Sequence, residues 1–258
     1  MSDSPQDTFV SHLVELRNRL VVCLIVFGVI LLPLVTPPWF IAGKLYDFLA
    51  APMMAALPQG SKMIATGVIA PFFIPLKIAM MTAFLIALPV ILYQLWAFVA
   101  PGLYKHEKRF VLPLIISSTA LFFVGMSFCY FFVFKMVFSF IAQLAPASIN
   151  VAPDIENYFG FVLGMFMAFG LAFETPVVVV VLVATGLVSL EVLREVRRYV
   201  IVGAFVVAAV VTPPDVASQL ALAIPLCILY EIGLFAARFV KTGDATDATD
   251  ATDSTPAA

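Results

Sequence analysis

The sequence predicts an all-α, polytopic membrane protein, and three observations support this fold class. Hydrophobic residues make up 63% of the 258 residues and charged residues only 12%, and the mean hydropathy is +1.09. Several stretches reach the roughly 20 apolar residues that an α-helix needs to cross a bilayer. The charged residues are spread unevenly and gather between these stretches. We therefore expect one transmembrane domain, residues 20–240, with six spans.

The six predicted spans differ in length. The third is too long for an upright helix and should tilt or project beyond the bilayer. The fifth allows only about 21 Å of helix against a hydrocarbon core of ~30 Å, and the sixth is also expected to be short. The membrane should thin at these two spans unless protein shelters them. The predicted spans are residues 20–38, 72–99, 110–144 and 158–187, the stretch between residues 198 and 212, and residues 216–235.

The first 19 residues form a separate cytoplasmic segment in this interpretation. Leucines recur at helical spacing on one face of residues 9–20, and His12, Glu15 and Arg19 share another face. This pattern predicts a short amphipathic helix on the membrane surface. Glu15 and Arg19 could form an i, i+4 ion pair worth a few tenths of a kcal/mol. The alternative is that Glu15 is an acidic docking point.

Two loops carry further signals. Residues 41–56 and 63–70 are apolar but broken by Pro52 and by a turn, which predicts short helices along the outer membrane face. The loop 101–109 is basic, and Glu107 is its only acid. Glu107 either balances its basic neighbours or, like Glu15, offers a carboxylate at the membrane surface.

The distribution of basic residues predicts the topology. Cytoplasmic loops of membrane proteins carry an excess of Lys and Arg. Arg17 and Arg19 precede the first span, and further basic residues follow the second, fourth and sixth spans. Both termini are therefore expected in the cytoplasm. The tail, residues 241–258, repeats Asp-Ala-Thr and is predicted to be disordered.

Glu174 is the most unusual residue in the chain. It lies inside the apolar stretch 158–187, roughly 20 Å or more from either end of a helix of that length. Intramembrane acids usually face a protein interior or a watery cavity and mark function. Pro176 removes a helical hydrogen bond and leaves the carbonyl of Ala172 to find another partner. The structural alternative is a protonated glutamic acid that ties two helices together.

No spacing in the sequence suits an enzyme, a metal site or a cofactor. The two histidines lie outside the spans, and there is no H-E-x-x-H, no G-x-S-x-G and no phosphate-binding glycine loop. Cys23, Cys129 and Cys227 lie far apart in apolar segments and are interpreted as packing residues. A proton- or ion-coupled small-solute transporter remains an alternative because of Glu174, although no clear inverted repeat is present.

Four stretches together resemble the TatC family, the membrane receptor of the twin-arginine translocation system. They are H-L-V-E-L-R-N-R (residues 12–19), the loop 101–109, F-G-L-A-F-E-T-P (residues 169–176) and V-T-P-P-D (residues 211–215). The resemblance extends to about Lys241 and excludes the acidic tail. It implies a protein of the bacterial inner membrane, with no role in nucleic-acid binding and no enzymatic activity.

The resemblance also implies a function and partners. A TatC-like protein binds twin-arginine signal peptides of folded precursors within an oligomeric TatBC complex. It then recruits TatA for export driven by the proton-motive force. Carried over by motif, Glu15, Glu107 and Arg17 belong to the signal-peptide site, and the two glutamates receive the signal's arginines. Guanidinium and carboxylate pair well through bidentate, charge-assisted hydrogen bonds. The apolar part of the signal would lie in a concave groove.

The remaining motif positions concern partner helices and turns. By resemblance, Glu174, Thr212 and Gln219 line the groove or contact the transmembrane helices of TatA and TatB. Four further residues are expected to shape the outer cap and the turn between the last two spans, and these are Pro52, Pro213, Pro214 and Asp215.

Overall fold

The computed structural model describes residues 5–36, 40–57, 62–99, 108–144, 152–212 and 216–239. Within these ranges the chain is almost entirely helical, and the only β-type pairing is an isolated bridge between Ile64 and Asp154. The predicted all-α fold is confirmed. The elements are α1 (Pro5–Val35), α2 (Phe40–Ala56), α3 (Ala70–Val99), α5 (Lys108–Phe128), the π-helical turn η1 (Cys129–Val133), α6 (Phe134–Leu144), α7 (Ile155–Phe173), α8 (Thr175–Ala184), α9 (Leu190–Glu195), α10 (Arg197–Val211) and α11 (Val216–Ala237).

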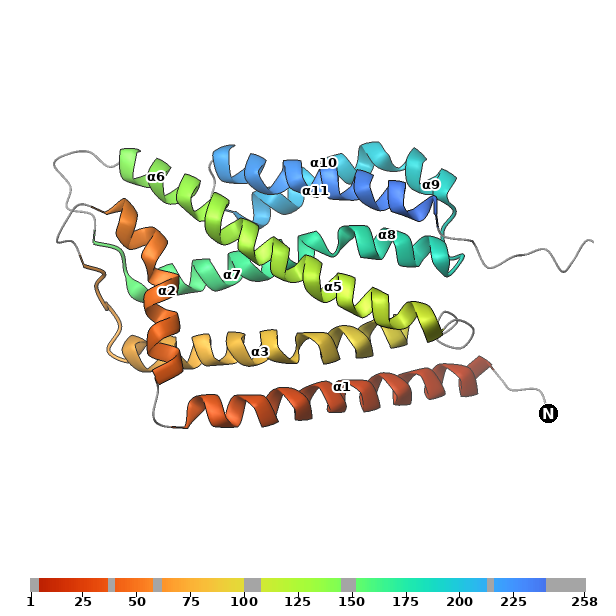
Figure 1. Cartoon of the computed structure of the whole chain (residues 1–258), viewed down its shortest axis with the longest axis horizontal. Helices are drawn as coiled ribbons and strands as arrows, with labels where there is room; N and C mark the ends of the chain where they lie inside the picture. The colour runs from red at the N-terminus through yellow and green to blue at the C-terminus, as the bar shows by residue number, and fades with distance from the viewer. Residues whose placement is uncertain are drawn as a thin grey trace, which may run out of the picture.

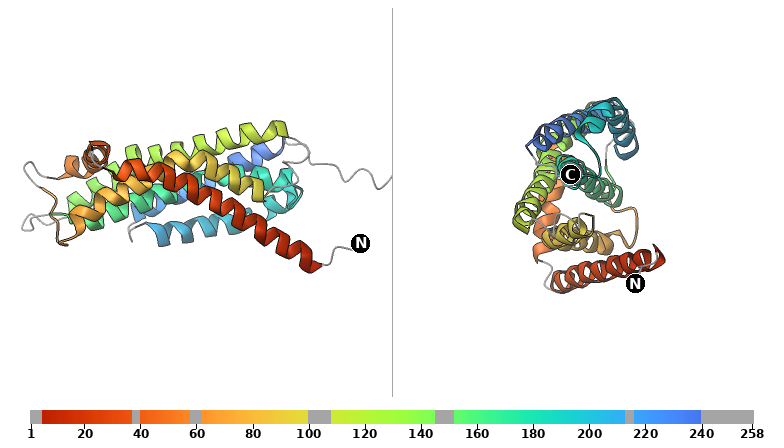
Figure 2. Two further views of the ribbon diagram at one scale, coloured as in Figure 1. Left: turned by 90° about the horizontal axis from the view of Figure 1, so that it is seen from below. Right: turned by 90° about the vertical axis from the view of Figure 1, so that its right-hand side faces the viewer.

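Most helices run along the long axis of the molecule, and α2 lies across one end of the bundle (Figure 1). Helix α1 packs beside α3, while α10 and α11 form an antiparallel hairpin at the opposite edge, as the end view in Figure 2 shows. The start of α1, helix α9 and the end of α11 lie together at the other end. We call this the basic end because Arg194, Arg197 and Arg198 are exposed there.

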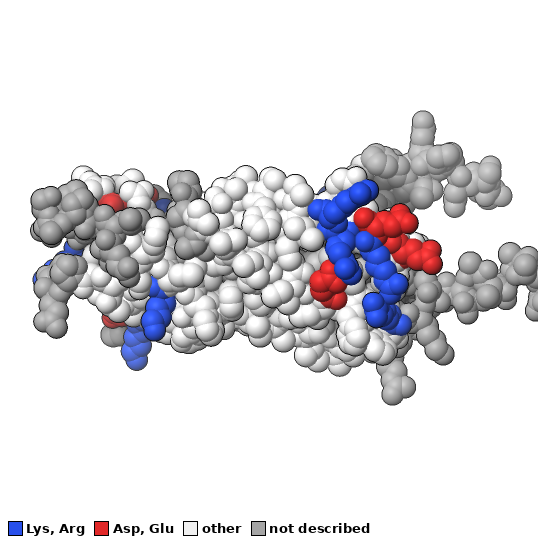
Figure 3. Space-filling model, turned by 90° about the horizontal axis from the view of Figure 1, so that it is seen from above, with Lys and Arg blue, Asp and Glu red and all other residues white. Residues whose placement is uncertain are grey.

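Among the residues that the structure describes, five segments are long and apolar enough to cross a membrane, namely Ser11–Val35, Ala70–Val99, Leu112–Ile141, Ile155–Ala184 and Ser218–Ala237. Figure 3 shows the corresponding uncharged band between the charged residues at the two ends of one face. Helix α10 has only 15 residues, or about 22 Å, so it is short as predicted. Helix α11 has 22 residues, or about 33 Å, so the prediction of a short sixth span was wrong.

The long third span is accommodated without a break. Helices α5 and α6 are joined through η1, a single π-helical turn, and together they cross the bundle diagonally over α7 (Figure 1). A π-turn inserts one extra residue per turn and locally shifts which side chains face the core. Cys129 and Val133 of this turn are buried, consistent with the packing role expected for Cys129.

Helix α1 is continuous from Pro5 to Val35, so the separate surface helix expected at residues 9–20 does not form as its own element. The amphipathic stretch instead extends the first span beyond the apolar band. No described side chain of α1 is buried, and the helix packs mainly on α3. Most of its surface is therefore left for lipid or for another protein.

Helix α8 contains five consecutive valines, Val177 to Val181, and follows directly after Glu174. β-branched residues lose side-chain freedom in a helix, so this run has a weak helix preference of its own. Val179 and Val183 are buried with Tyr230 and Leu234 of α11. Packing against α11 therefore helps to stabilise this segment as a helix.

The α2 end is closed by contacts between segments far apart in the chain. The short helix expected at residues 63–70 does not form, because residues 62–69 are not helical. Instead, the backbone N–H of Ile64 donates to Pro153 and its carbonyl accepts from Ile155. Lys77 pairs with Glu156 at 3.3 Å. This ion pair therefore links α3 to the start of α7 at the α2 end.

Asp154 organises this end of the molecule. Its carboxylate accepts hydrogen bonds from the hydroxyl and backbone N–H of Thr66 and, as the N-cap of α7, from the backbone N–H groups of Glu156 and Asn157. These bonds, led by that from the Thr66 hydroxyl, lower the pKa of Asp154 from 3.8 to about 2. The charged form is therefore the one that the fold prefers.

Replacing Asp154 with asparagine is expected to lower the melting temperature at neutral pH, because the negative charge at the N-terminus of α7 and the charge-assisted hydrogen bond from the Thr66 hydroxyl are lost. A lowered pKa gives stability that is fully present above pH 3.8 and is lost as the pH falls through about 2. The difference between Asp154→Asn and wild type should shrink over this window in thermal unfolding measured across pH. Thr66→Val should move the window towards pH 3.8. Parallel curves down to pH 2 would contradict this assignment.

Candidate functional site

At the basic end, Glu15 and Arg19 form the i, i+4 ion pair at 2.6 Å, so this sequence interpretation is confirmed. Arg19 also donates to the side-chain amide oxygen of Gln94 on α3, at 3.2 Å. The Glu15 side chain remains 42% exposed and that of Arg19 25% exposed. His12 stacks on Phe98, also on α3. A partly exposed carboxylate is therefore held against α3, within reach of a charged ligand.

Helix α9 adds a second charged surface at the basic end. Ser189 caps the helix through the backbone N–H of Val192. Arg197 at the start of α10 pairs with Glu231 of α11 at 2.8 Å, with nearly half of each side chain exposed. Exposed pairs of this kind contribute little to stability. Such pairs do hold charged side chains in fixed positions at the basic end, where Figure 3 shows basic and acidic residues side by side.

Glu174 lies at the junction of α7 and α8. Figure 1 shows that these two helices meet about midway along the bundle. The residue is 6% exposed, so the carboxyl group is removed from the surroundings of the protein. The Ala172 carbonyl, which Pro176 deprives of its usual donor, accepts a hydrogen bond of 2.6 Å from the Thr175 hydroxyl. The local sequence F-E-T-P therefore satisfies its own backbone where the proline interrupts the helix.

The Glu174 carboxyl group contacts another helix. Ser118 of α5 donates its hydroxyl hydrogen bond to Oε2 of Glu174, and Trp96 of α3 donates its indole N–H to the Ser118 oxygen at 3.1 Å. The other carboxyl oxygen, Oε1, is buried and has no hydrogen-bond partner within the described structure. Glu174 thus ties helices together, as the structural alternative proposes, and still presents an unsatisfied oxygen.

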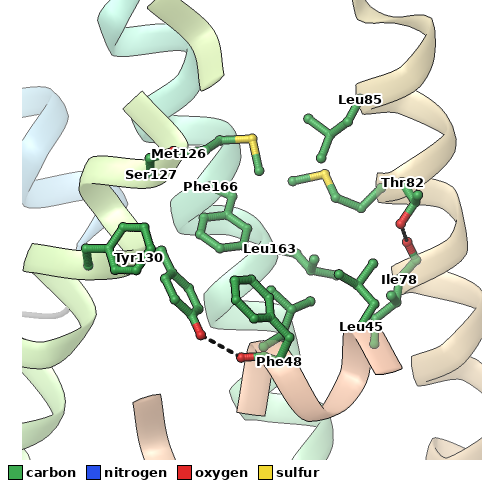
Figure 4. Close-up of a pocket in the computed structure, with 13 residues that line it drawn as sticks. Leu45, Phe48, Ile78, Thr82, Leu85, Met126, Ser127, Tyr130, Leu163 and Phe166 are labelled. Atoms are coloured by element: carbon green, nitrogen blue, oxygen red, sulfur yellow. Dashed lines mark hydrogen bonds between the residues drawn. The ribbon is translucent and has the colours of Figure 1, made fainter. Parts of the chain in front are cut away.

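An apolar pocket of about 200 Å³ lies near the α2 end, between α2, α3, α7 and the α5–η1 region (Figure 4). Figure 4 shows Phe48 and Tyr130 side by side, with the Tyr130 hydroxyl donating to the Phe48 backbone oxygen at 2.8 Å. Thr82 faces the pocket from α3 but donates to the Ile78 carbonyl of its own helix. Glu174 does not line this pocket.

The other predicted site residues are only partly brought together. Thr212 is buried at the end of α10 and donates to the Ala208 carbonyl at 2.8 Å. Gln219 is half-buried in the first turn of α11, and Pro52 is half-buried within α2 at the far end. Arg17 is exposed and donates to Asn18. Outside the described residues lie Glu107, Pro213, Pro214 and Asp215.

Sequence reasoning missed three polar residues at these sites. Ser118 belongs to the run Ser117, Ser118, Thr119 inside an apolar span, and a cluster of hydroxyls at that depth was a usable signal. Gln94 and Trp96 lie near the end of a span. Their only signal in the sequence was a side chain that can form hydrogen bonds. In the described ranges, no group of three or more His, Cys, Asp or Glu residues could hold a metal ion.

Together, the fold and the site define a multi-pass helical membrane protein with a charged end and a buried carboxylic acid about midway along the bundle. A family model described as Sec-independent protein translocase protein (TatC) matches residues 11–225. The chain belongs to the TatC family.

Individual relatives agree with this assignment. The chain is 51% identical over 239 residues to the Sec-independent protein translocase protein TatC of Escherichia coli strain K12, covering 93% of this chain and 91% of that protein. It is 47% identical to the Haemophilus influenzae protein of the same name, covering 91% and 90%. A crystal structure titled as the twin-arginine translocase receptor TatC superposes with a TM-score of 0.75 at 39% identity, covering 89% of this chain and 99% of that one.

Proposed function

We propose that this protein is the signal-peptide receptor of a twin-arginine translocase in the bacterial inner membrane, with both termini in the cytoplasm. The observation that carries the proposal is the half-exposed Glu15 carboxylate at the basic end of a TatC-family fold. Signal arginines would compete with Arg19 for this carboxylate, with Glu107 as the second acceptor. Arg17 completes the proposed site. Membership in a translocase family favours this function over small-solute transport.

The proposed partners are TatA and TatB, together with further copies of this chain in a TatBC complex. Most of the short helix α10 is exposed, and only Ala204 and Ala208 of its residues are buried. Such an uncovered apolar helix can pack against a single-span partner helix within the bilayer. Thr212 and Gln219, on either side of the α10–α11 connection, would supply polar contacts there. The region around the short α10 is the proposed thinned part of the membrane.

Binding of a labelled signal peptide to the purified, detergent-solubilised protein tests the receptor proposal. Replacing the peptide's Arg-Arg with Lys-Lys should weaken binding, because an ammonium group cannot form the bidentate pair with a carboxylate. Equal binding of both peptides, with TatB also present, would refute the proposal. Uptake of a small solute by the protein alone in vesicles would instead support the transporter alternative.

Glu15→Gln is expected to weaken peptide binding roughly tenfold, since one charge-assisted hydrogen-bonded contact is lost at a partly exposed site. Glu231→Gln is the matched control, because Glu231 is also paired with an arginine at the basic end and is similarly exposed. This control should bind the peptide like wild type. Glu107→Gln should act in the same direction as Glu15→Gln. Unchanged affinity in both the Glu15 and Glu107 variants would exclude these residues as the docking site.

A further inference from the structure

Three buried polar side chains from three separate elements meet beside the α7–α8 junction. Trp96 of α3 is 5% exposed, Ser118 of α5 is fully buried, and Glu174 is 6% exposed. They form a continuous chain of hydrogen bonds from the indole through the hydroxyl to the carboxyl group. Buried polar chains of this kind are conformationally specific, because each group that loses its partner pays a desolvation penalty.

The indole fixes the direction of the first bond in this chain. An indole N–H can only donate a hydrogen bond, whereas a serine hydroxyl has one proton and two lone pairs. Trp96 therefore occupies one lone pair of the Ser118 oxygen, and the Ser118 hydroxyl in turn donates to Glu174. Without Trp96, the Ser118 hydroxyl would be free to rotate to other acceptors.

Neighbouring serines on the same long span show what that other acceptor would be. Ser117 donates to the Leu114 carbonyl, and Ser127 donates to the Phe123 carbonyl, both within their own helix. This local bond is the common choice of a serine within a helix. Ser118 instead donates to a carboxyl group 56 residues away. Its hydroxyl is therefore committed to holding Glu174.

The two carboxyl oxygens of Glu174 differ in their hydrogen bonding. Oε2 of Glu174 is held by Ser118, and Oε1 is buried without a partner among the described residues. We propose that Ser118, oriented by Trp96, is a positioning residue that fixes the Glu174 carboxyl group, so that Oε1 stays buried and unpaired until the α7–α8 junction opens to a polar side chain on a partner transmembrane helix. A side-chain amide or hydroxyl has the chemistry to bond this oxygen. The partner contact rests on the proposed function, whereas the positioning does not.

The indole resonance of Trp96 tests the positioning directly. The chain has two tryptophans, so a Trp39→Phe background labelled with ¹⁵N-tryptophan gives one indole signal. Ser118→Ala should shift the indole proton upfield, because its hydrogen bond is lost. Glu174→Gln should also shift it when Ser118 is present and should have no effect in the Ser118→Ala background. Ser117→Ala is the control, since this exposed serine bonds only to its own helix, and it should leave the signal unchanged.

Crosslinking tests the consequence for the partner. Ser118→Ala should lower crosslinking of TatA or TatB to the α7–α8 junction roughly tenfold and should leave signal-peptide binding intact. Ser118→Thr keeps the hydroxyl and should restore the crosslink. Signal-peptide binding confirms that each variant is folded.

The outcomes separate the two ideas. If Glu174→Gln shifts the indole signal equally in both backgrounds, or not at all, the positioning role of Ser118 is wrong whatever the protein's function. If Glu174→Gln shifts the indole signal only when Ser118 is present, but the wild-type protein gives no crosslink to TatA or TatB, then Ser118 does position Glu174 and the proposed partner contact is wrong. A Ser118→Ala protein that crosslinks like wild type would overturn the proposed pairing of Oε1 with a partner.

Discussion

Replacing Glu174 with alanine is expected to abolish transport of a folded precursor and to reduce crosslinking of TatA or TatB to the α7–α8 junction to background. The substitution removes the buried carboxyl group at the α7–α8 junction, together with its unsatisfied Oε1 atom. The fold should survive, because Ser118 can turn to a carbonyl of its own helix, as Ser117 does. Signal-peptide binding at the basic end, about half the bundle away, should be unaffected.

Glu174→Gln is the informative companion to this variant. Glutamine keeps the size of the side chain and an oxygen that can accept from Ser118, but it cannot release or carry a proton. Retained crosslinking with lost transport would indicate that proton exchange at Glu174 is needed after the partner binds. Full transport and an unaffected crosslink in Glu174→Ala would leave Glu174 with only its structural role in tying α5 to the α7–α8 junction.

Gly125→Ala is expected to destabilise the protein strongly. A Cβ atom at Gly125 would lie 2.5 Å from the backbone oxygen of Phe169 and 2.8 and 2.9 Å from atoms of the Phe173 side chain. Real Cβ atoms do not approach backbone oxygen so closely, so α5 and α7 would have to separate. Overpacking of this kind typically costs about 1–3 kcal/mol and can cost more where the backbone must shift. Close approach at small residues is how membrane helices pack without a hydrophobic driving force.

Gly160→Ala is the matched control for this prediction. Gly160 lies on α7, and a Cβ atom there meets nothing within 4 Å. Because alanine is the better helix former, this substitution should be neutral or slightly stabilising. The two variants are compared by thermal unfolding of the purified protein in one detergent. Equal melting temperatures would show that the α5–α7 contact at Gly125 can relax.

The large features of the fold could be predicted because bilayer thickness sets them. The apolar lengths of the spans and the short α10 follow from counting residues against a hydrocarbon core of fixed depth. The burial of Glu174 within the protein follows from its isolation in an apolar stretch. The continuity of α1 could not be predicted, because an amphipathic stretch followed by an apolar one is compatible with one helix or two.

The contacts of the site could not be predicted for a different reason. Ser118 and Glu174 are 56 residues apart, and Thr66 and Asp154 are 88 apart. Helical periodicity shows which residues share a face of one helix, but it does not show which faces meet. In the run from Ser117 to Thr119, successive residues point about 100° apart, so only the packing of α5 on its neighbours selects Ser118.

The valine run of α8 has a consequence for how the chain is made. Five adjacent β-branched residues favour a strand in water, and an exposed segment of this kind is prone to aggregate. Helix α11, which packs on α8, is synthesised after it. The nascent chain therefore contains the valine run before α11 is present to cover it. We therefore expect α8 to enter the bilayer during synthesis, before α11 is made. Insertion during synthesis protects this segment until α11 arrives to complete the bundle.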